Sequence, residues 1–108
     1  MTNLTGMKCV ACEGGMAPMT REDAMEKMTQ VPGWTLSDDA TSLHRAWELK
    51  DFMEAFAFLT KVAALAEEEG HHPEIWNSWN KVKLTLSTHS IGGLSMNDFI
   101  LAAKINAL

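Results

Sequence analysis

The sequence predicts an α+β domain, and two observations lead to this fold class. Apolar residues recur at helical spacing in three segments, each opened by a capping pattern, and they alternate in four short segments placed between these. The resulting order is helix, strand, strand, helix, strand, strand, helix. Strands that follow one another in pairs are typical of an antiparallel sheet, and hence of an α+β rather than an α/β domain.

The first part of this domain is predicted to hold a short helix and a hairpin. A capping box at residues 20–23 opens the helix, and Pro32 and Gly33 end it. Residues 34–36 and 43–49 alternate like strands, with a turn at residues 38–41.

The longest periodic run of the chain follows and predicts an amphipathic helix of about 18 residues. Gly70 stands where a left-handed C-cap is expected. The expected apolar stripe consists of Phe52, Phe56, Leu59, Ala63 and Ala66.

Two strands and a helix complete the domain. Residues 75–79 and 82–88 are predicted to pair antiparallel through a turn at Asn80 and Lys81. A further capping box at residues 95–98 opens a helix that runs almost to the end of the chain.

Size and charge exclude several classes of function. At 108 residues and 11.9 kDa the chain is one domain, and a net charge of −5 with a pI near 5.2 offers no basic surface for nucleic acid. No run approaches the roughly 20 apolar residues that span a bilayer, and no basic segment precedes an apolar one at the N-terminus. We therefore expect a cytoplasmic protein that binds neither nucleic acid directly nor a membrane.

Residues 1–19 are expected to form a flexible N-terminal arm, and residues 20–108 the folded domain. The arm is rich in Gly, Met, Thr and Pro and shows no sustained period. It carries Cys9 and Cys12, too few ligands for a zinc site and outside the βαβ context of thioredoxin-like chemistry. Reduced thiols are the simplest interpretation, and the alternatives are a metal shared between subunits or a regulatory disulfide.

Candidate functional residues gather between residues 67 and 98, where three of the four histidines lie. The long helix ends in three glutamates, although the helix dipole disfavours negative charge at the C-terminal end of a helix. Glu67 lies near the edge of the apolar stripe and is expected to point inward. His71 and His72 follow in an extended segment before Pro73, where neighbouring side chains take opposite faces, so we do not expect both to bind one metal ion.

His89 is expected to lie near this doublet. It ends the last predicted strand on the polar side, and antiparallel pairing places that end of the hairpin beside Pro73. An imidazole titrates near pH 6.5 and could exchange protons at cellular pH. Asp98 is the fourth residue of its capping box, and a second role in a site remains open.

Other aromatic and imidazole side chains receive structural interpretations. Trp34, Trp76 and Trp79 are expected in the core or in an interface, because large aromatic residues dominate both. His44 is interpreted as a surface residue.

The spacing from Glu67 to Asp98 resembles the signature of the pterin-4a-carbinolamine dehydratases. The pattern is Glu, three residues, His-His-Pro, five residues, an aromatic residue, nine residues, His, eight residues, Asp. Further matching segments extend the resemblance from roughly residue 20 to the end: 33–34, 49–52, 54–56, 77–82, 84–89 and 93–94.

The resemblance implies a fold, a reaction and a set of site residues. The fold is a four-stranded antiparallel sheet with three helices packed on one face. The reaction converts 4a-hydroxytetrahydropterin to quinonoid dihydropterin and water, without metal or cofactor, and recycles the pterin for an aromatic amino acid hydroxylase. The catalytic residues would be His71 and His89, as acid and base in either order, with His72 orienting the pterin. Substrate-binding residues would be Glu67, Ser87, Thr88, Asp98 and Trp34.

The sequence departs from the family pattern at two places, and other functions stay open. Gly70 stands where vertebrate members have Asp, and Trp79 where Tyr is usual. The alternatives are a pterin-binding protein of another pathway, such as molybdenum cofactor metabolism, and a dimerisation cofactor for a homeobox transcription factor. The implied partners are the pterin, further copies of the chain in a homodimer or homotetramer, and the hydroxylase.

Overall fold

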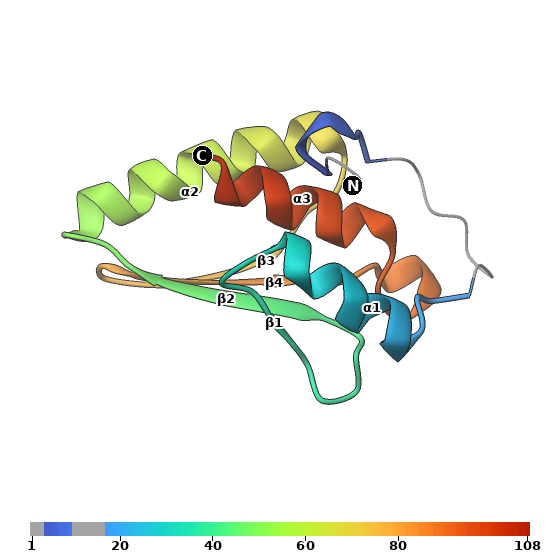
Figure 1. Ribbon diagram of the computed structural model, residues 1–108. Helices are drawn as coiled ribbons and strands as arrows, with labels where there is room; N and C mark the ends of the chain where they lie inside the picture. Colours follow the sequence, from blue (N-terminus) through green and yellow to red (C-terminus); the bar gives the residue numbers. More distant parts are fainter. Residues whose placement is uncertain (1–3, 10–16) are drawn as a thin grey trace.

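A four-stranded antiparallel sheet carries three α-helices on one face in the computed structural model, which describes residues 4–9 and 17–108 (Figure 1). The strands pair in the spatial order β1-β2-β4-β3. The predicted α+β fold class is confirmed. The strands are β1 (Thr35–Leu36), β2 (Leu43–Glu48), β3 (Glu74–Ser78) and β4 (Lys81–Leu86), and the helices are α1 (Arg21–Lys27), α2 (Phe52–Glu69) and α3 (Met96–Asn106).

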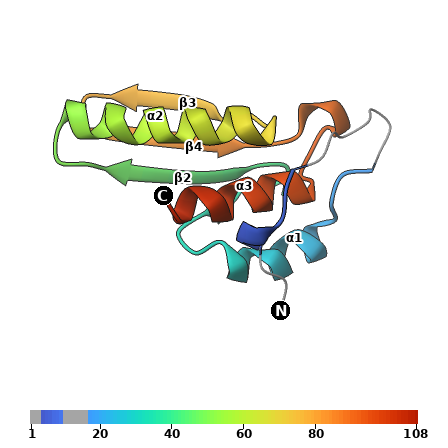
Figure 2. The same cartoon turned by 90° about the horizontal axis from the view of Figure 1, so that it is seen from above.

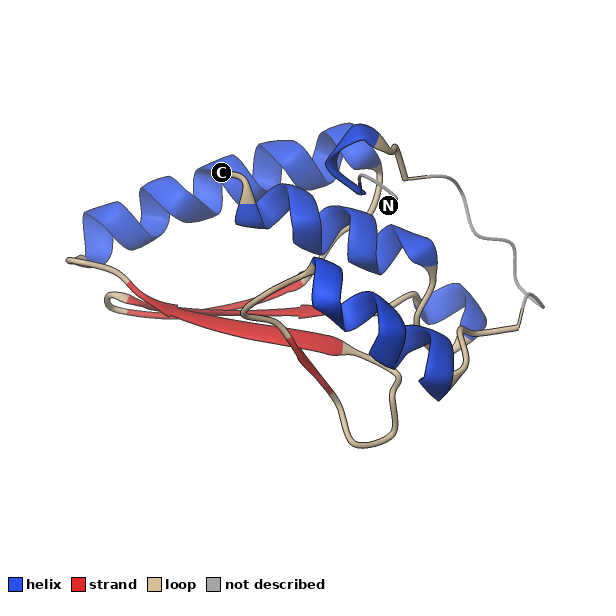
Figure 3. Cartoon of the chain, viewed as in Figure 1, coloured by secondary structure: helices blue, strands red, loops and turns tan. Residues whose placement is uncertain are grey.

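The helices leave the opposite side of the sheet uncovered within the part of the chain that is described. Figure 3 shows α2 and α3 above the strands, and Figure 2 shows α2 along β3 and β4, with α3 beside β2. Thr85 of β4 pairs directly with His44 of β2 and Glu74 of β3, so these three side chains share one face. We call this helix-free side the outer face.

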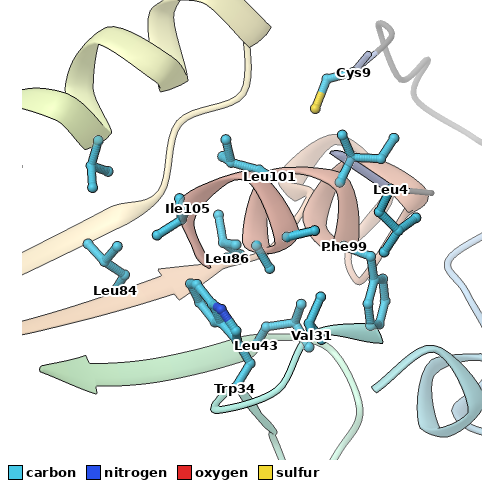
Figure 4. Close-up of a cluster of buried hydrophobic side chains, with 14 of the residues drawn as sticks. Leu4, Cys9, Val31, Trp34, Leu43, Leu84, Leu86, Phe99, Leu101 and Ile105 are labelled. Carbon is cyan, nitrogen blue, oxygen red and sulfur yellow. The ribbon is translucent and has the colours of Figure 1, made fainter. Parts of the chain in front are cut away.

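The core lies between the sheet and the helices. Val82, Leu84 and Leu86 alternate along β4 and are fully buried, as the strand period of two requires. Leu101 and Ile105 of α3 pack over them at helical spacing (Figure 4).

Helix α2 has the predicted bounds but turns a different face to the sheet. Asp51 caps its first turn, and Gly70 ends it with φ 67° and ψ 25°, the left-handed C-cap expected. Phe52 and Phe56, placed in the buried stripe by the sequence, are about half exposed. Ala63 is exposed as well, whereas Leu59 and Ala66 are buried as predicted. The predicted stripe is wrong in part because the run is apolar around most of its circumference, so its period did not decide which side faces the sheet. The buried residues are Ala55, Leu59, Val62, Ala66 and Glu69.

The second hairpin also differs from the prediction in detail. Ser78 pairs with Lys81, so the turn consists of Trp79 and Asn80, and Trp79 takes the left-handed φ of 51°. Strand β4 ends at Leu86, and the chain then enters a 3₁₀ turn at His89–Ile91. His89 therefore follows the strand instead of ending it.

Residues 4–9, part of the expected arm, pack onto the domain. Leu4 and Cys9 are buried, and the segment lies against α3. The Cys9 backbone N–H donates to Glu69 Oε1 at 2.9 Å, and its free thiol lies 3.5 Å from the carbonyl of Asn97. Cys12 lies outside the described residues. No helix in the described ranges is long and apolar enough to cross a membrane.

Candidate active site

The histidine doublet sends its two rings to opposite sides, as an extended backbone requires. The His71 side chain is 12% exposed, and its Nε2 lies 2.6 Å from Asp98 Oδ1 at the start of α3. The His72 side chain is 59% exposed, and its Nε2 lies 2.6 Å from Glu67 Oε1. Because a carboxylate only accepts hydrogen bonds, each Nε2 donates and each Nδ1 is left for another partner.

Asp98 holds His71 and caps α3 at the same time. This carboxylate is completely buried, and its Oδ2 accepts from Thr88 Oγ1 at 2.8 Å and from the Ser95 backbone N–H at 3.0 Å. The capping box is therefore present, and the same carboxylate also contacts His71. Thr88 is also buried, and its hydroxyl donates a hydrogen bond to this carboxylate.

A cavity of about 300 Å³ opens on the outer face at the end of β4. Three residues predicted for the site border it, namely His72, Ser87 and His89. Ser42, His44, Glu74 and Thr85 complete the lining. This group is called the histidine cavity below.

His44 belongs to the wall of the histidine cavity and is half-buried, in contrast to the surface position inferred from the sequence. Its Nε2 lies 2.8 Å from Ser42 Oγ, and its Nδ1 lies 3.0 Å from Thr85 Oγ1. Hydroxyl groups both donate and accept, so these two partners satisfy either neutral tautomer of the ring. Sequence reasoning missed His44 and Glu74 because their place beside Thr85 depends on strand register, and the only signal was the period of two.

The inward glutamate at the end of α2 is Glu69 and not Glu67. The Glu67 side chain is 80% exposed, whereas that of Glu69 is 2% exposed. Glu69 follows Ala66 by three residues on the buried face, and its Oε2 lies 2.8 Å from Lys104 Nζ. Hydrogen bonds from Lys104 and from the Cys9 backbone hold the pKa of Glu69 below its usual value.

Two other predicted features lie away from the histidine cavity. Trp34 is in the hydrophobic core, where its Nε1 donates to Asn106 Oδ1 at 2.9 Å and its ring meets Trp47 edge to face. Burial, followed by the charge of Glu69, raises the pKa of the Cys9 thiol to about 12, so this thiol stays protonated at neutral pH. Neither residue lines the cavity.

The histidine cavity combines proton carriers with groups that bind a polar ring. His72 and His89 can each move a proton, while Glu74, Ser87 and Thr85 offer acceptors and donors. Within residues 4–9 and 17–108, no three His, Cys, Asp or Glu side chains gather as metal ligands. The side chains that line the cavity can exchange protons and form hydrogen bonds with a polar ligand.

Comparison with known proteins points to one family. A family model described as pterin 4 alpha carbinolamine dehydratase matches residues 17–108. A protein of Methylococcus capsulatus named for that family is 45% identical over 106 residues, which cover 98% of this chain and 93% of the relative.

Two solved structures are also similar. The first, titled a transcriptional coactivator/pterin dehydratase from Brucella melitensis, has a TM-score of 0.79 and 37% identity and covers 83% of this chain and 96% of its own. The second, titled a pterin dehydratase-like protein as a RuBisCO assembly factor in the alpha-carboxysome, has a TM-score of 0.61 and 25% identity. That match covers 72% of this chain and 90% of the other.

Proposed function

The chain belongs to the pterin 4 alpha carbinolamine dehydratase family, and from this premise we propose that it removes water from a 4a-hydroxytetrahydropterin. The observation that carries the proposal is the grouping of His72, His89 and Glu74 around one cavity, with the His71–Asp98 pair beside it. The quinonoid dihydropterin produced would be reduced again in pterin recycling, beside an aromatic amino acid hydroxylase.

The dehydration needs two proton transfers. One proton goes to the departing 4a-hydroxyl, which leaves as water, and another is removed from the N5–H as the C4a–N5 double bond forms. We assign these transfers to His71 and His89. Asp98 accepts from His71 Nε2 and so fixes the ring and its tautomer, which leaves Nδ1 as the nitrogen that can accept a proton.

The remaining polar groups of the cavity bind the pterin in this proposal. Carboxylates accept hydrogen bonds from the amino group and ring N–H groups of a pterin, a role suited to Glu74 in the cavity wall and to Glu67 beside His72. His72 is the orienting residue, held by Glu67. Ser87 Oγ donates to the Thr41 carbonyl at 2.9 Å and keeps its lone pairs for the ligand.

A coupled phenylalanine hydroxylase assay tests this function. We expect the purified protein to accelerate dehydration of the 4a-hydroxytetrahydropterin above the spontaneous rate, and His89→Ala and His71→Ala to lose about 100-fold or more of the catalysed rate. Lys61→Ala, on the exposed side of α2, is the matched control and should keep the rate. A folded protein without acceleration would contradict the proposal.

Protein binding is a second candidate function, favoured by exposed apolar side chains. Phe52 and Phe56 on α2, and Ile75, Trp76 and Trp79 on the β3 hairpin, are 45% to 66% exposed. Single exposed apolar residues are ordinary, but several large ones on two elements indicate an interface. We propose that further copies of the chain cover these residues in a homodimer or homotetramer, and that any other protein partner would use the same side chains.

A further inference from the structure

A second cavity, also of about 300 Å³, adjoins the histidine cavity on the outer face. Both cavities have His44 and Thr85 in their walls. The second cavity extends from this shared pair along β2 and β4, toward Ala46 and Lys83, which pair directly with each other. Its full lining is Gly33, Thr35, His44, Arg45, Ala46, Lys83, Leu84 and Thr85.

The ionisable residues of this second cavity are all basic. They are His44, Arg45 and Lys83, with no Asp or Glu among the lining residues. The chain as a whole carries a net charge of −5, so the excess of cations is local. The histidine cavity differs, because Glu74 lies in its wall.

Neither long basic side chain is neutralised by a carboxylate in the described part of the chain. The Arg45 guanidinium donates to the Pro32 carbonyl and to Asn106 Oδ1, and lies 4.7 Å from the centre of the Trp47 ring. Lys83 Nζ lies 4.9 Å from the centre of the Trp76 ring. Arg45 pairs with the buried Leu84, so its side chain lies on the helix side of the sheet, and Lys83 is the long basic side chain that faces the second cavity.

We infer that the second cavity binds the anionic end of a substituent carried by the pterin, such as a phosphate ester. The inference rests on the proposed function, because the histidine cavity must hold the ring. Each cavity alone is at the lower limit of ligand sites, roughly 300 Å³, whereas the two joined at His44 and Thr85 suit a ring with an extended side chain. A phosphate would meet Lys83 as a charge-assisted partner, with the His44 imidazole beside it in the shared wall.

Binding of two pterin ligands, measured under anaerobic conditions by isothermal titration calorimetry, tests this inference. The probes are 6-hydroxymethyl-7,8-dihydropterin and its phosphate monoester, which share a ring and differ in charge at the substituent. We expect the ester to bind about two- to fivefold tighter, as one partly solvated ion pair allows. This preference should shrink as the ionic strength rises from about 0.01 M to 0.15 M, because salt screens exposed charges.

A pair of charge reversals on one strand supplies the control. Lys83→Glu should abolish the preference for the ester, whereas Lys81→Glu should keep it, because Lys81 is also exposed on β4 but lines neither cavity. Circular dichroism checks that both variants are folded.

Each outcome separates this inference from the proposed function. Equal affinity for the two probes, or a preference that survives Lys83→Glu, would overturn the inference and leave the pterin site intact. Inorganic phosphate that binds alone, with no gain when it is attached to the pterin, would overturn the assignment to a substituent. Failure of both pterins to bind would overturn both proposals.

Discussion

Replacing Asp98 by Asn would separate the structural role of this carboxylate from its role in catalysis. Asp98 accepts hydrogen bonds from His71 Nε2, Thr88 Oγ1 and the Ser95 backbone N–H, and it is completely buried. An Asn side chain has one accepting oxygen and one donating NH₂. If the oxygen keeps the Thr88 and Ser95 bonds, the NH₂ faces His71, and His71 Nε2 must then accept.

The substitution should therefore move the His71 proton from Nε2 to Nδ1. Nδ1 would then donate where in the native protein it accepts, and with the proton transfer assigned to His71 we expect dehydration to slow by about 100-fold or more. The loss of charge assistance in the buried hydrogen bonds should also lower the free energy of unfolding by about 1–3 kcal/mol.

The assay combines urea unfolding, the coupled dehydration rate and long-range ¹H–¹⁵N spectra of histidine-labelled protein, which distinguish the two tautomers. Ser95→Ala is the matched control. It removes the cap hydroxyl of α3 at a cost of about 1 kcal/mol but leaves the contact between His71 and Asp98. A proton that stays on Nε2 of His71 in Asp98→Asn, or a native rate in that variant, would refute the reasoning.

Three further predictions concern stability, reactivity and assembly. Because the pKa of Glu69 is lowered on folding, this carboxylate contributes fully to stability above its ordinary pKa of 4.5, and the contribution is lost as the pH falls through the folded-state pKa. The urea midpoint should therefore fall more steeply below about pH 4.5 in the native protein than in Glu69→Gln. A midpoint with the same pH dependence in both would contradict this. In a Cys12→Ser background, iodoacetamide at pH 8 should alkylate Cys9 at least about 100-fold more slowly in the folded protein than in urea, because the thiol is buried and its pKa is raised to about 12. Phe56→Glu should shift the protein to a smaller species in sedimentation velocity, while Lys61→Glu on the same helix should not. An unchanged sedimentation coefficient in Phe56→Glu would place the interface elsewhere.

Local signals in the sequence were sufficient to predict the features of the structure that depend only on neighbouring residues. The bounds of α2 follow from Asp51 at one end and Gly70 at the other, and the capping box of α3 from Ser95 and Asp98. The opposite directions of His71 and His72 follow from the geometry of an extended chain.

The remaining features depend on contacts between distant residues. Glu69 points inward because Lys104 and the Cys9 backbone, 35 and 60 residues away, neutralise and bind it. His44 enters the cavity wall because β2 pairs with β4 in a register that places it beside Thr85. A period of two or 3.6 indicates that a residue shares a face with its neighbours, but not what that face meets.

Alternate side chains of strand β4 contribute to the hydrophobic core, and the side chains between them line the cavities. Val82, Leu84 and Leu86 are buried, while Lys83 and Thr85 face the outer side. Substitutions at these outer positions can therefore accumulate over evolution without disturbing the residues that keep the domain folded. An inserted residue would instead turn the core residues of β4 to the outer face and the outer residues to the core. The ligand preference of the cavities can therefore change through point mutations in β4 but not through changes in the length of this strand.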